Sequence, residues 1–277
     1  MRSLVFLLIV ALLGVGYYLL TPEGRQLIDR TRINWTRADH LARYQTGKPL
    51  PGTPDLARFD KRLAAHDLKL GAPVFIRIFK LEWELEIWLE KDGRFIRFAT
   101  YPICKWSGRL GPKLKEGDRQ APEGFYTVAA EQLNPNSRWH RSFNLGYPNL
   151  FDQAHGRTGS FLMVHGGCGS IGCYAMTDAV VDEIWRLVTA ALEAGQPRFH
   201  VHVFPFRMTE RNLGARKGYR WSRFWAELKQ GYDLFEANRV PPVVSVCKGR
   251  YVFAPASAGN LGDAIEERCP PDVARNQ

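Results

Sequence analysis

Apolar and polar side chains alternate along three consecutive stretches near the start of the chain's main body. They read VFIRIFK (74–80), ELEIWL (84–89) and RFIRFATY (94–101), and Asp92-Gly93 stands between the last two. Alternation with a period of two predicts half-buried strands, and Asp-Gly between strands is typical of a tight hairpin turn. We therefore expect an antiparallel start to a sheet.

Farther along the chain, a second apolar stretch is followed by apolar residues at helical spacing. FLMV (161–164) predicts a strand, and Thr177 predicts the N-cap of a helix. Further helices are expected at Leu56–Leu68 and within Tyr219–Asn238, and strands at Arg198–Phe204 and Val243–Phe253. The pattern indicates a mixed α/β fold that is mainly β. The apolar residues that define the helix after Thr177 are Val180, Val181, Ile184, Leu187, Val188, Ala191 and Leu192.

The N-terminal apolar run decides the expected compartment. Residues 4–20 carry no charge and follow Arg2, which fits either a signal-peptide core or a short membrane anchor. No clear A-x-A cleavage site follows, which favours an anchor, whereas the arginines after the run oppose the usual charge bias. We expect a signal peptide or anchor over 1–22 and a juxtamembrane or helical linker over 23–72.

The segment HGGCGSIGC places one histidine and one cysteine where they could act together. His165 ends the apolar run, and Cys173 ends a glycine-rich loop just ahead of the predicted helix. A thiol becomes a strong nucleophile when an imidazole takes its proton or a positive field stabilises the thiolate. The helix amino end and the loop amides would also favour a tetrahedral intermediate. The pattern predicts a cysteine enzyme.

The remaining cysteines leave alternatives open. If Cys173 is free, the other four can pair in three ways or not at all; they are Cys104, Cys168, Cys247 and Cys269. A zinc site from His155, His165, Cys168 and Cys173 matches no regular spacing and would quench the thiolate, so we expect no metal and no cofactor.

The net charge and the histidine pattern limit which ligands and macromolecules we expect the protein to bind. The net charge of +10 suits an anionic partner, yet no P-loop, zinc finger or RNA-binding signature accompanies it, so nucleic acid is not expected. His200 and His202 share one face of their predicted strand, and a polar sheet face explains them more simply than metal binding.

HG followed by SxGC, an apolar residue and Met resembles the active-site signature of the YkuD-type L,D-transpeptidase catalytic domain. With FKLEWELEIWLEKDG, YPICKWSGRLGPKLKEGDRQAPEGFYTV, FPFRMTE and PPVVSVCKGRYV, the chain is similar to the YafK-like (DpaA) branch over about residues 73–254. Ile171 and Ala175 stand where most members of the wider family carry a histidine and an arginine. The resemblance implies a β-sandwich or barrel-like catalytic domain at 73–207 with a helix after the nucleophile. A helix and strand extension at 208–255 and a disordered tail at 256–277 would follow.

The resemblance also assigns roles to residues. Cys173 would be the nucleophile and His165 the base, with the imidazole oriented by the carbonyl of Gly166. Amides around Gly172 and Cys173 would hold the oxyanion, with Ser170 in support. The expected substrate-binding residues are Lys105, Arg109, Lys113 and Tyr174.

The implied activity is acyl transfer on peptidoglycan at diaminopimelate, in the periplasm. The YafK-like branch implies hydrolytic release of a murein-linked outer-membrane lipoprotein, and the expected partners are stem peptides, that lipoprotein and, through an uncleaved N-terminus, the inner membrane. A transpeptidase that forms cross-links or lipoprotein attachments is the first alternative. A peptidoglycan-binding protein with a structural thiol and a cysteine enzyme acting on another amide are the others.

Overall fold

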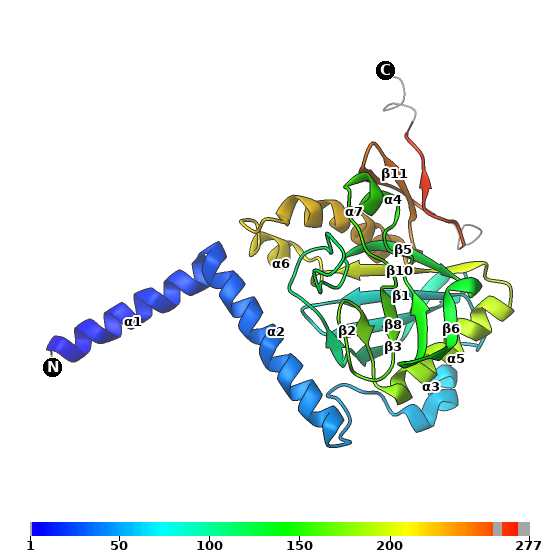
Figure 1. Cartoon of the computed structure of the whole chain (residues 1–277), viewed down its shortest axis with the longest axis horizontal. Coiled ribbons are helices and arrows are strands. Elements are labelled where there is room, and N and C mark those ends of the chain that lie inside the picture. The colour runs from blue at the N-terminus through cyan, green and yellow to red at the C-terminus, as the bar shows by residue number, and fades with distance from the viewer. Residues whose placement is uncertain (1, 257–261, 271–277) are drawn as a thin grey trace.

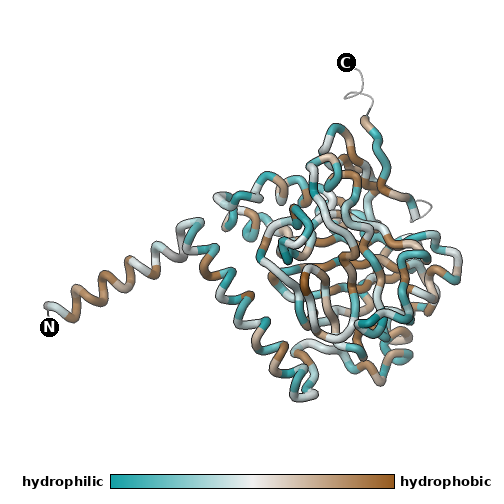
Figure 2. Tube along the Cα trace, in the orientation of Figure 1, coloured by the Kyte–Doolittle hydropathy of each residue, from teal (hydrophilic) through white to brown (hydrophobic). Residues whose placement is uncertain are grey.

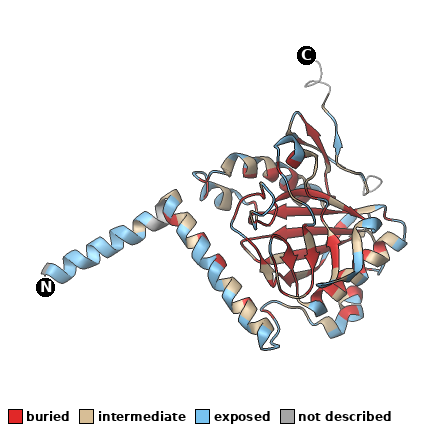
Figure 3. Cartoon of the chain, in the orientation of Figure 1, coloured by how far each residue is buried: buried red, intermediate tan, exposed pale blue. Residues whose placement is uncertain are grey.

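The computed structural model describes residues 2–256 and 262–270 (Figure 1). Helix α1 (Arg2–Leu20) projects away from the body of the protein, and α2 (Pro22–Gln45) runs along its side. Figure 2 shows that α1 is mostly hydrophobic, and Figure 3 shows that it is exposed. Within the described residues no helix alone is long and apolar enough to span a membrane; α1 and α2 meet that test only as a pair bent by 84°. The signal peptide or anchor therefore stays a prediction.

The first sheet contains the antiparallel start that the alternation predicted. Strands β1, β2 and β3 pair antiparallel in sequence order, and β10 then joins β1 in parallel. Asp92 and Gly93 both have positive φ angles, as a tight hairpin requires. In spatial order the strands are β3 (Arg94–Pro102), β2 (Glu84–Lys91), β1 (Val74–Phe79), β10 (Arg198–Phe204) and β5 (Gly124–Ala129).

The crossover from β1 to β10 contains a second five-stranded sheet, and a three-stranded sheet lies near the C-terminus. The second sheet has the order β4 (Lys105–Trp106), β9 (Tyr174–Ala175), β8 (Met163–His165), β7 (His140–Asn144) and β6 (Leu133–Ser137). The third has the order β12 (Arg250–Ala254), β11 (Val243–Cys247) and β13 (Glu266–Glu267). The other elements are η1 (Leu56–Arg58), α3 (Phe59–Ala65), η2 (Ala130–Gln132), α4 (Leu150–Ala154), α5 (Asp178–Glu193), α6 (Glu210–Gly214) and α7 (Ser222–Asn238).

The main core lies between the two five-stranded sheets and α5. Phe143 of β7 meets Phe199 of β10 edge to face, with ring centroids 5.4 Å apart. Val164 and Ile184 are fully buried in the same cluster. Burial of large apolar side chains from both sheets and the helix drives this packing. The mixed, mainly β architecture expected from the sequence is thus confirmed.

The other face of the first sheet, on which the histidines lie, carries both polar and aromatic side chains and is buried: Arg77 stands beside His202 and forms an ion pair with Glu86 at 3.0 Å. His202 lies between Phe75 and Phe125, with ring centroids 4.6 and 4.7 Å away, and α7 adds Phe235 to the cluster. His200 is also buried. Burial holds the pKa of His202 well below its ordinary value. Aromatic side chains from neighbouring elements, which a single-strand pattern cannot reveal, bury this face.

The C-terminal segment is more ordered than expected. The predicted strand 243–253 is a hairpin of β11 and β12, and β13 adds a parallel strand to β11. A disulfide between Cys247 and Cys269 ties the same segment down. The expected disorder is therefore wrong for residues 262–270. The rest of that tail, 257–261 and 271–277, lies outside the described residues.

Helix α2 is fixed to the body by a buried ion pair. Asp29 accepts hydrogen bonds from Nε and Nη2 of Arg216 at 2.9 and 2.8 Å, and a third from the Tyr219 hydroxyl at 2.6 Å. One turn further on, Ile33 joins the main core. Two parallel charge-assisted hydrogen bonds fix orientation as well as position. The linker expected over 23–72 is therefore largely a docked helix, and the helix expected at 56–68 is η1 followed by α3.

We expect Asp29→Ala to lower the free energy of unfolding by about 3–5 kcal/mol, because the buried Arg216 charge would lose its partner. Denaturant-induced unfolding measures the change. Asp39→Ala is the matched control on the same helix: Asp39 forms an exposed i,i+4 pair with Arg43, and its loss should cost about 0.5 kcal/mol or less. Equal losses in the two variants would contradict the assigned role of Asp29.

Candidate active site

Cys173 and His165 lie at two short strands that pair in parallel: His165 ends β8, and Cys173 directly precedes β9. In the pairing of β8 with β9, His165 stands opposite Ala175. Successive side chains alternate between the faces of a sheet, so Cys173, two residues before Ala175, shares the face of His165. The N–H of Met163 donates to Sγ of Cys173 at 3.4 Å, which places the thiol against β8. The strand expected at 161–164 is shorter and begins at Met163.

The His165 imidazole is buried and held in one orientation. Its Nδ1 lies 2.6 Å from the carbonyl oxygen of Gly166, and only 2% of the residue is exposed. Donation from Nδ1 to that carbonyl leaves Nε2 with a free lone pair. Burial lowers the pKa of His165 below its ordinary value, while the bond to Gly166 opposes the shift. The imidazole is therefore neutral at pH 7, the form that can accept a proton.

The Cys173 thiol rests in a neutral state. It is 9% exposed, and its S–H donates to the carbonyl of Phe161 at 3.7 Å. Burial raises the pKa of the thiol, and the Met163 N–H and the charge of Lys113 lower it by less. Desolvation of the buried thiol therefore outweighs the opposing contributions of the Met163 N–H and the Lys113 charge.

Two disulfides leave Cys173 as the free cysteine. Cys104 pairs with Cys168 and Cys247 with Cys269, one of the three possible connectivities. The first bridge joins the glycine-rich loop to the segment before β4 and is fully buried. It also removes Cys168 from the alternative zinc set. Within the described residues no three His, Cys, Asp or Glu side chains are grouped as a metal would need.

Hydroxyl groups fix the end of the glycine-rich loop. Oγ of Ser170 donates to the carbonyl of Cys173 at 2.6 Å, and Oγ of Ser107 donates to the carbonyl of Ser170 at 2.9 Å. Gly172 has a φ of +113°, which L side chains rarely adopt. The N–H groups of Gly172 and Cys173 have no hydrogen-bond acceptor in the described part of the chain, and their role in holding the oxyanion stays a prediction.

Sequence reasoning missed the aromatic cover of this loop. Trp139, in the turn between β6 and β7, has its ring centroid 5.8 Å from that of His165. A Cβ atom at Gly167 or Gly169 would lie 3.1 or 3.2 Å from the indole, so both glycines permit the contact. Ser142 was also missed; it stands opposite His165 in β7, buried, with no hydrogen-bond partner for its hydroxyl among the described residues. A large aromatic in the polar stretch NSRWHRS was the one available signal.

Asp178, the first residue of α5, binds the glycine-rich loop. Oδ1 of Asp178 accepts from the N–H of Gly167 at 2.7 Å. A Cβ atom at Gly166 would lie 2.6 Å from the same oxygen and 3.1 Å from the carbonyl of Trp139. Thr177 is the N-cap as predicted, although its side chain makes no capping hydrogen bond.

Two of the expected substrate-binding residues are enclosed in the structure. Tyr174 is fully buried, and its hydroxyl donates to the carbonyl of Pro122 at 2.6 Å. Lys113 is 4% exposed, and its ammonium donates to Oδ1 of Asp118 at 2.6 Å. Both side chains are buried and already hydrogen-bonded, and contact of either with substrate stays a prediction. Tyr174 supports the core, and the charge of Lys113 acts on the thiol.

The other two candidates lie in different places. Lys105 stands opposite Ala175 in the pairing of β4 with β9, so it shares the face of Cys173 and His165. Arg109 is exposed and lines a cavity formed with α2, in which neither Cys173 nor His165 takes part. Contact of either residue with substrate stays a prediction.

Comparison with known proteins connects this geometry to a family. The YkuD family model, an L,D-transpeptidase catalytic domain, matches residues 86–212. The chain is also 50% identical over 185 residues to "Putative L,D-transpeptidase YafK" of Escherichia coli (strain K12), covering 67% of this chain and 75% of that protein. The chain belongs to the YkuD family. The resemblance inferred from the sequence motifs is thus confirmed.

Solved structures are more distant from this YkuD-family protein. The helical cell shape determining protein Pgp2 from Campylobacter jejuni is 20% identical with a TM-score of 0.39, and 65% of this chain and 68% of that chain are covered. Bdellovibrio bacteriovorus Bd1075 is 14% identical with a TM-score of 0.37, and the covered shares are 71% and 92%. Similarity at this level carries no information about activity.

We expect the alkylation rate of Cys173 in this YkuD-family protein to rise with pH to a midpoint above about 8.5, the ordinary cysteine value. Thiolate is the reactive form, and burial disfavours it. Iodoacetamide labelling under non-reducing conditions, followed by mass spectrometry of the Cys173 peptide, measures the rate. Cys173→Ala gives the background. A rate already maximal near pH 6 would instead indicate a preformed thiolate and imidazolium.

We expect Gly166→Ala to destabilise the protein by about 1–3 kcal/mol, because the new methyl group would overlap Asp178 and displace the loop. Thermal unfolding measures the loss. Gly214→Ala in α6 is the control, since nothing lies within 4 Å of a Cβ atom there. Unchanged stability in both variants would show that the loop accommodates a side chain at residue 166.

Proposed function

We propose that this protein is a cysteine acyltransferase or amidase that acts on peptidoglycan at diaminopimelate through an acyl-enzyme. The supporting observation is that Cys173, the free cysteine, directly precedes the strand that pairs with the strand of His165, and that the bond from Nδ1 of His165 to Gly166 leaves its Nε2 able to accept a proton. Membership of the YkuD family supports peptidoglycan as the substrate class. Export to the periplasm follows from that substrate, and α1 would serve as signal peptide or anchor.

The first half-reaction transfers the acyl group to the enzyme. Nε2 of His165 takes the proton of the Cys173 thiol as Sγ attacks the carbonyl carbon at diaminopimelate. The N–H groups of Gly172 and Cys173 donate to the oxyanion that forms. The C–N bond then breaks, the leaving amine takes the proton from His165, and a thioester on Cys173 remains.

A neutral resting pair suits this sequence of steps. The lowered pKa of His165 keeps the base unprotonated, and the raised pKa of Cys173 keeps the proton on sulfur until substrate is present. Proton transfer then accompanies attack. Lys113 and the loop amides stabilise the negative charge only as it develops, which favours the transition state over the resting enzyme.

The second half-reaction sets the outcome. Water releases the acyl group and makes the protein an amidase, as the YafK-like resemblance implies for a lipoprotein linked to diaminopimelate. An amine acceptor makes it a transpeptidase, the activity in the name of the E. coli relative. Both outcomes share the same thioester and differ in whether water or an amine reaches it.

We expect wild-type protein incubated with muropeptides to gain the mass of an acyl group on Cys173. Cys173→Ala should abolish the adduct. His165→Gln should slow its formation by about 10²- to 10⁴-fold, the usual contribution of a general base. Intact-protein mass spectrometry follows the adduct, and chromatography of the muropeptides identifies the product as hydrolysed or cross-linked.

Substrates with and without the linked lipoprotein separate the two outcomes. Release of free lipoprotein with no new cross-link would favour the amidase, and new cross-links would favour the transpeptidase. Muropeptides unchanged by wild-type protein, with Cys173 unmodified, would contradict the proposal and favour a binding protein with a structural thiol.

A further inference from the structure

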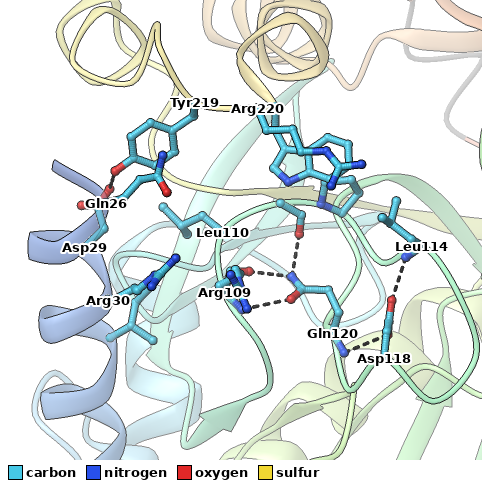
Figure 4. Close-up of a pocket in the computed structure, with 14 residues that line it drawn as sticks. Gln26, Asp29, Arg30, Arg109, Leu110, Leu114, Asp118, Gln120, Tyr219 and Arg220 are labelled. Atoms are coloured by element: carbon cyan, nitrogen blue, oxygen red, sulfur yellow. Dashed lines mark hydrogen bonds between the residues drawn. The ribbon is translucent and has the colours of Figure 1, made fainter. Parts of the chain in front are cut away.

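A cavity lies between α2, the loop 109–120 and the turn before α7. Its volume is about 430 Å³, within the range of pockets that hold small ligands. Figure 4 shows Arg30 on α2, Arg109 on the loop and Arg220 on the turn around this space. We call it the arginine cavity. Leu110, Tyr219 and Trp221 add apolar and aromatic wall to it.

The three arginines are free to bind an anion. None of them forms an ion pair with a carboxylate in the part of the chain that the structure describes; the Arg220 guanidinium stacks over the Trp221 ring, 4.7 Å from its centroid. The acidic residues of the wall are already paired, Asp29 with Arg216 and Asp118 with Lys113. The cavity therefore carries positive charge without a counter-charge of its own.

The wall of the cavity is built before any ligand arrives. The Gln120 side chain accepts from the N–H of Arg109 at 3.0 Å and donates to the carbonyls of Arg109 and Gly111. A Cβ atom at Gly111 would overlap Nε1 of Trp221, so the loop and the indole are in close contact. A preorganised wall reduces the entropy cost of binding.

The same loop lies between the cavity and the nucleophile. The carbonyl oxygen of Gln120 would be 3.8 Å from a Cβ atom at Gly172, beside Cys173. Lys113, whose charge acts on the thiol, pairs with Asp118 of the cavity wall. The loop 109–120 therefore contacts the cavity on one side and the segment beside Cys173 on the other.

We propose that the arginine cavity binds a carboxylate-bearing stem peptide of peptidoglycan while another part of the polymer is at Cys173. This inference rests on the proposed function. Three guanidinium groups from three separate elements, spread around one space with aromatic wall between them, suit a ligand with several separated carboxylates better than a single phosphate.

The test measures binding apart from catalysis, in the full-length chain carrying Cys173→Ala. Isothermal titration calorimetry with a purified disaccharide tetrapeptide should give a dissociation constant that rises about tenfold in Arg109→Ala and in Arg220→Ala. One lost charge-assisted hydrogen bond accounts for a change of that size. Lys115→Ala, which removes an exposed charge from the same loop outside the cavity, should leave the constant unchanged. Tetrapeptide whose carboxylates are amidated should bind the protein with intact arginines about as weakly as the unmodified tetrapeptide binds the arginine variants.

Two outcomes would overturn the inference. Equal affinity of all variants for the tetrapeptide would show that the cavity does not hold it. Arginine-dependent binding of inorganic phosphate or phosphatidylglycerol vesicles, but not of tetrapeptide, would assign the cavity to a phosphate group. Failure of wild-type protein to form the Cys173 adduct would contradict the proposed function alone, because the calorimetric result does not depend on the thiol.

Discussion

The parallel pairing of β8 with β9 is the constraint on which the candidate site depends. Strands of three and two residues make too few hydrogen bonds to persist alone, so neighbouring elements must hold them. β7 and β4 flank the pair, and the Cys104–Cys168 disulfide ties the loop that joins its strands to the segment before β4. Tertiary contacts with β7, β4 and the disulfide therefore hold the site in place, rather than the hydrogen bonds of the strand pair alone.

Burial and hydrogen bonding, rather than the field of a helix end, set the protonation states of the pair. Enclosure of His165 and Cys173 raises the cost of either charge, so proton transfer between them is unfavourable until a developing oxyanion adds a compensating interaction. A thiol in this state resists oxidation and alkylation while no substrate is bound, since both reactions need the thiolate.

The sequence predicted those parts of the structure that depend on local periodicity. The alternating strands, the Asp92-Gly93 turn and α5 follow from neighbouring residues, and the motif around Cys173 and His165 identified the family. A position next to the Cys173 motif in the sequence did not predict where a side chain lies in the fold. Tyr174 follows Cys173 directly, yet a strand turns consecutive side chains to opposite faces, and the tyrosine is therefore in the core. Trp139 and Ser142 come from a hairpin that reaches the site only through sheet pairing, which no local pattern encodes.

Residues outside the region matched by the YkuD family model pack against the catalytic domain. The match begins at residue 86, after α2, and ends at residue 212, before the Tyr219–Trp221 turn. Both segments nevertheless join the domain through the buried pair of Asp29 with Arg216, and together they complete the arginine cavity against a loop of the matched region. Shared chemistry requires only the strand pair and its loop. Selection among polymers can then change through α2 and the turn, because neither contributes a group to the reacting atoms.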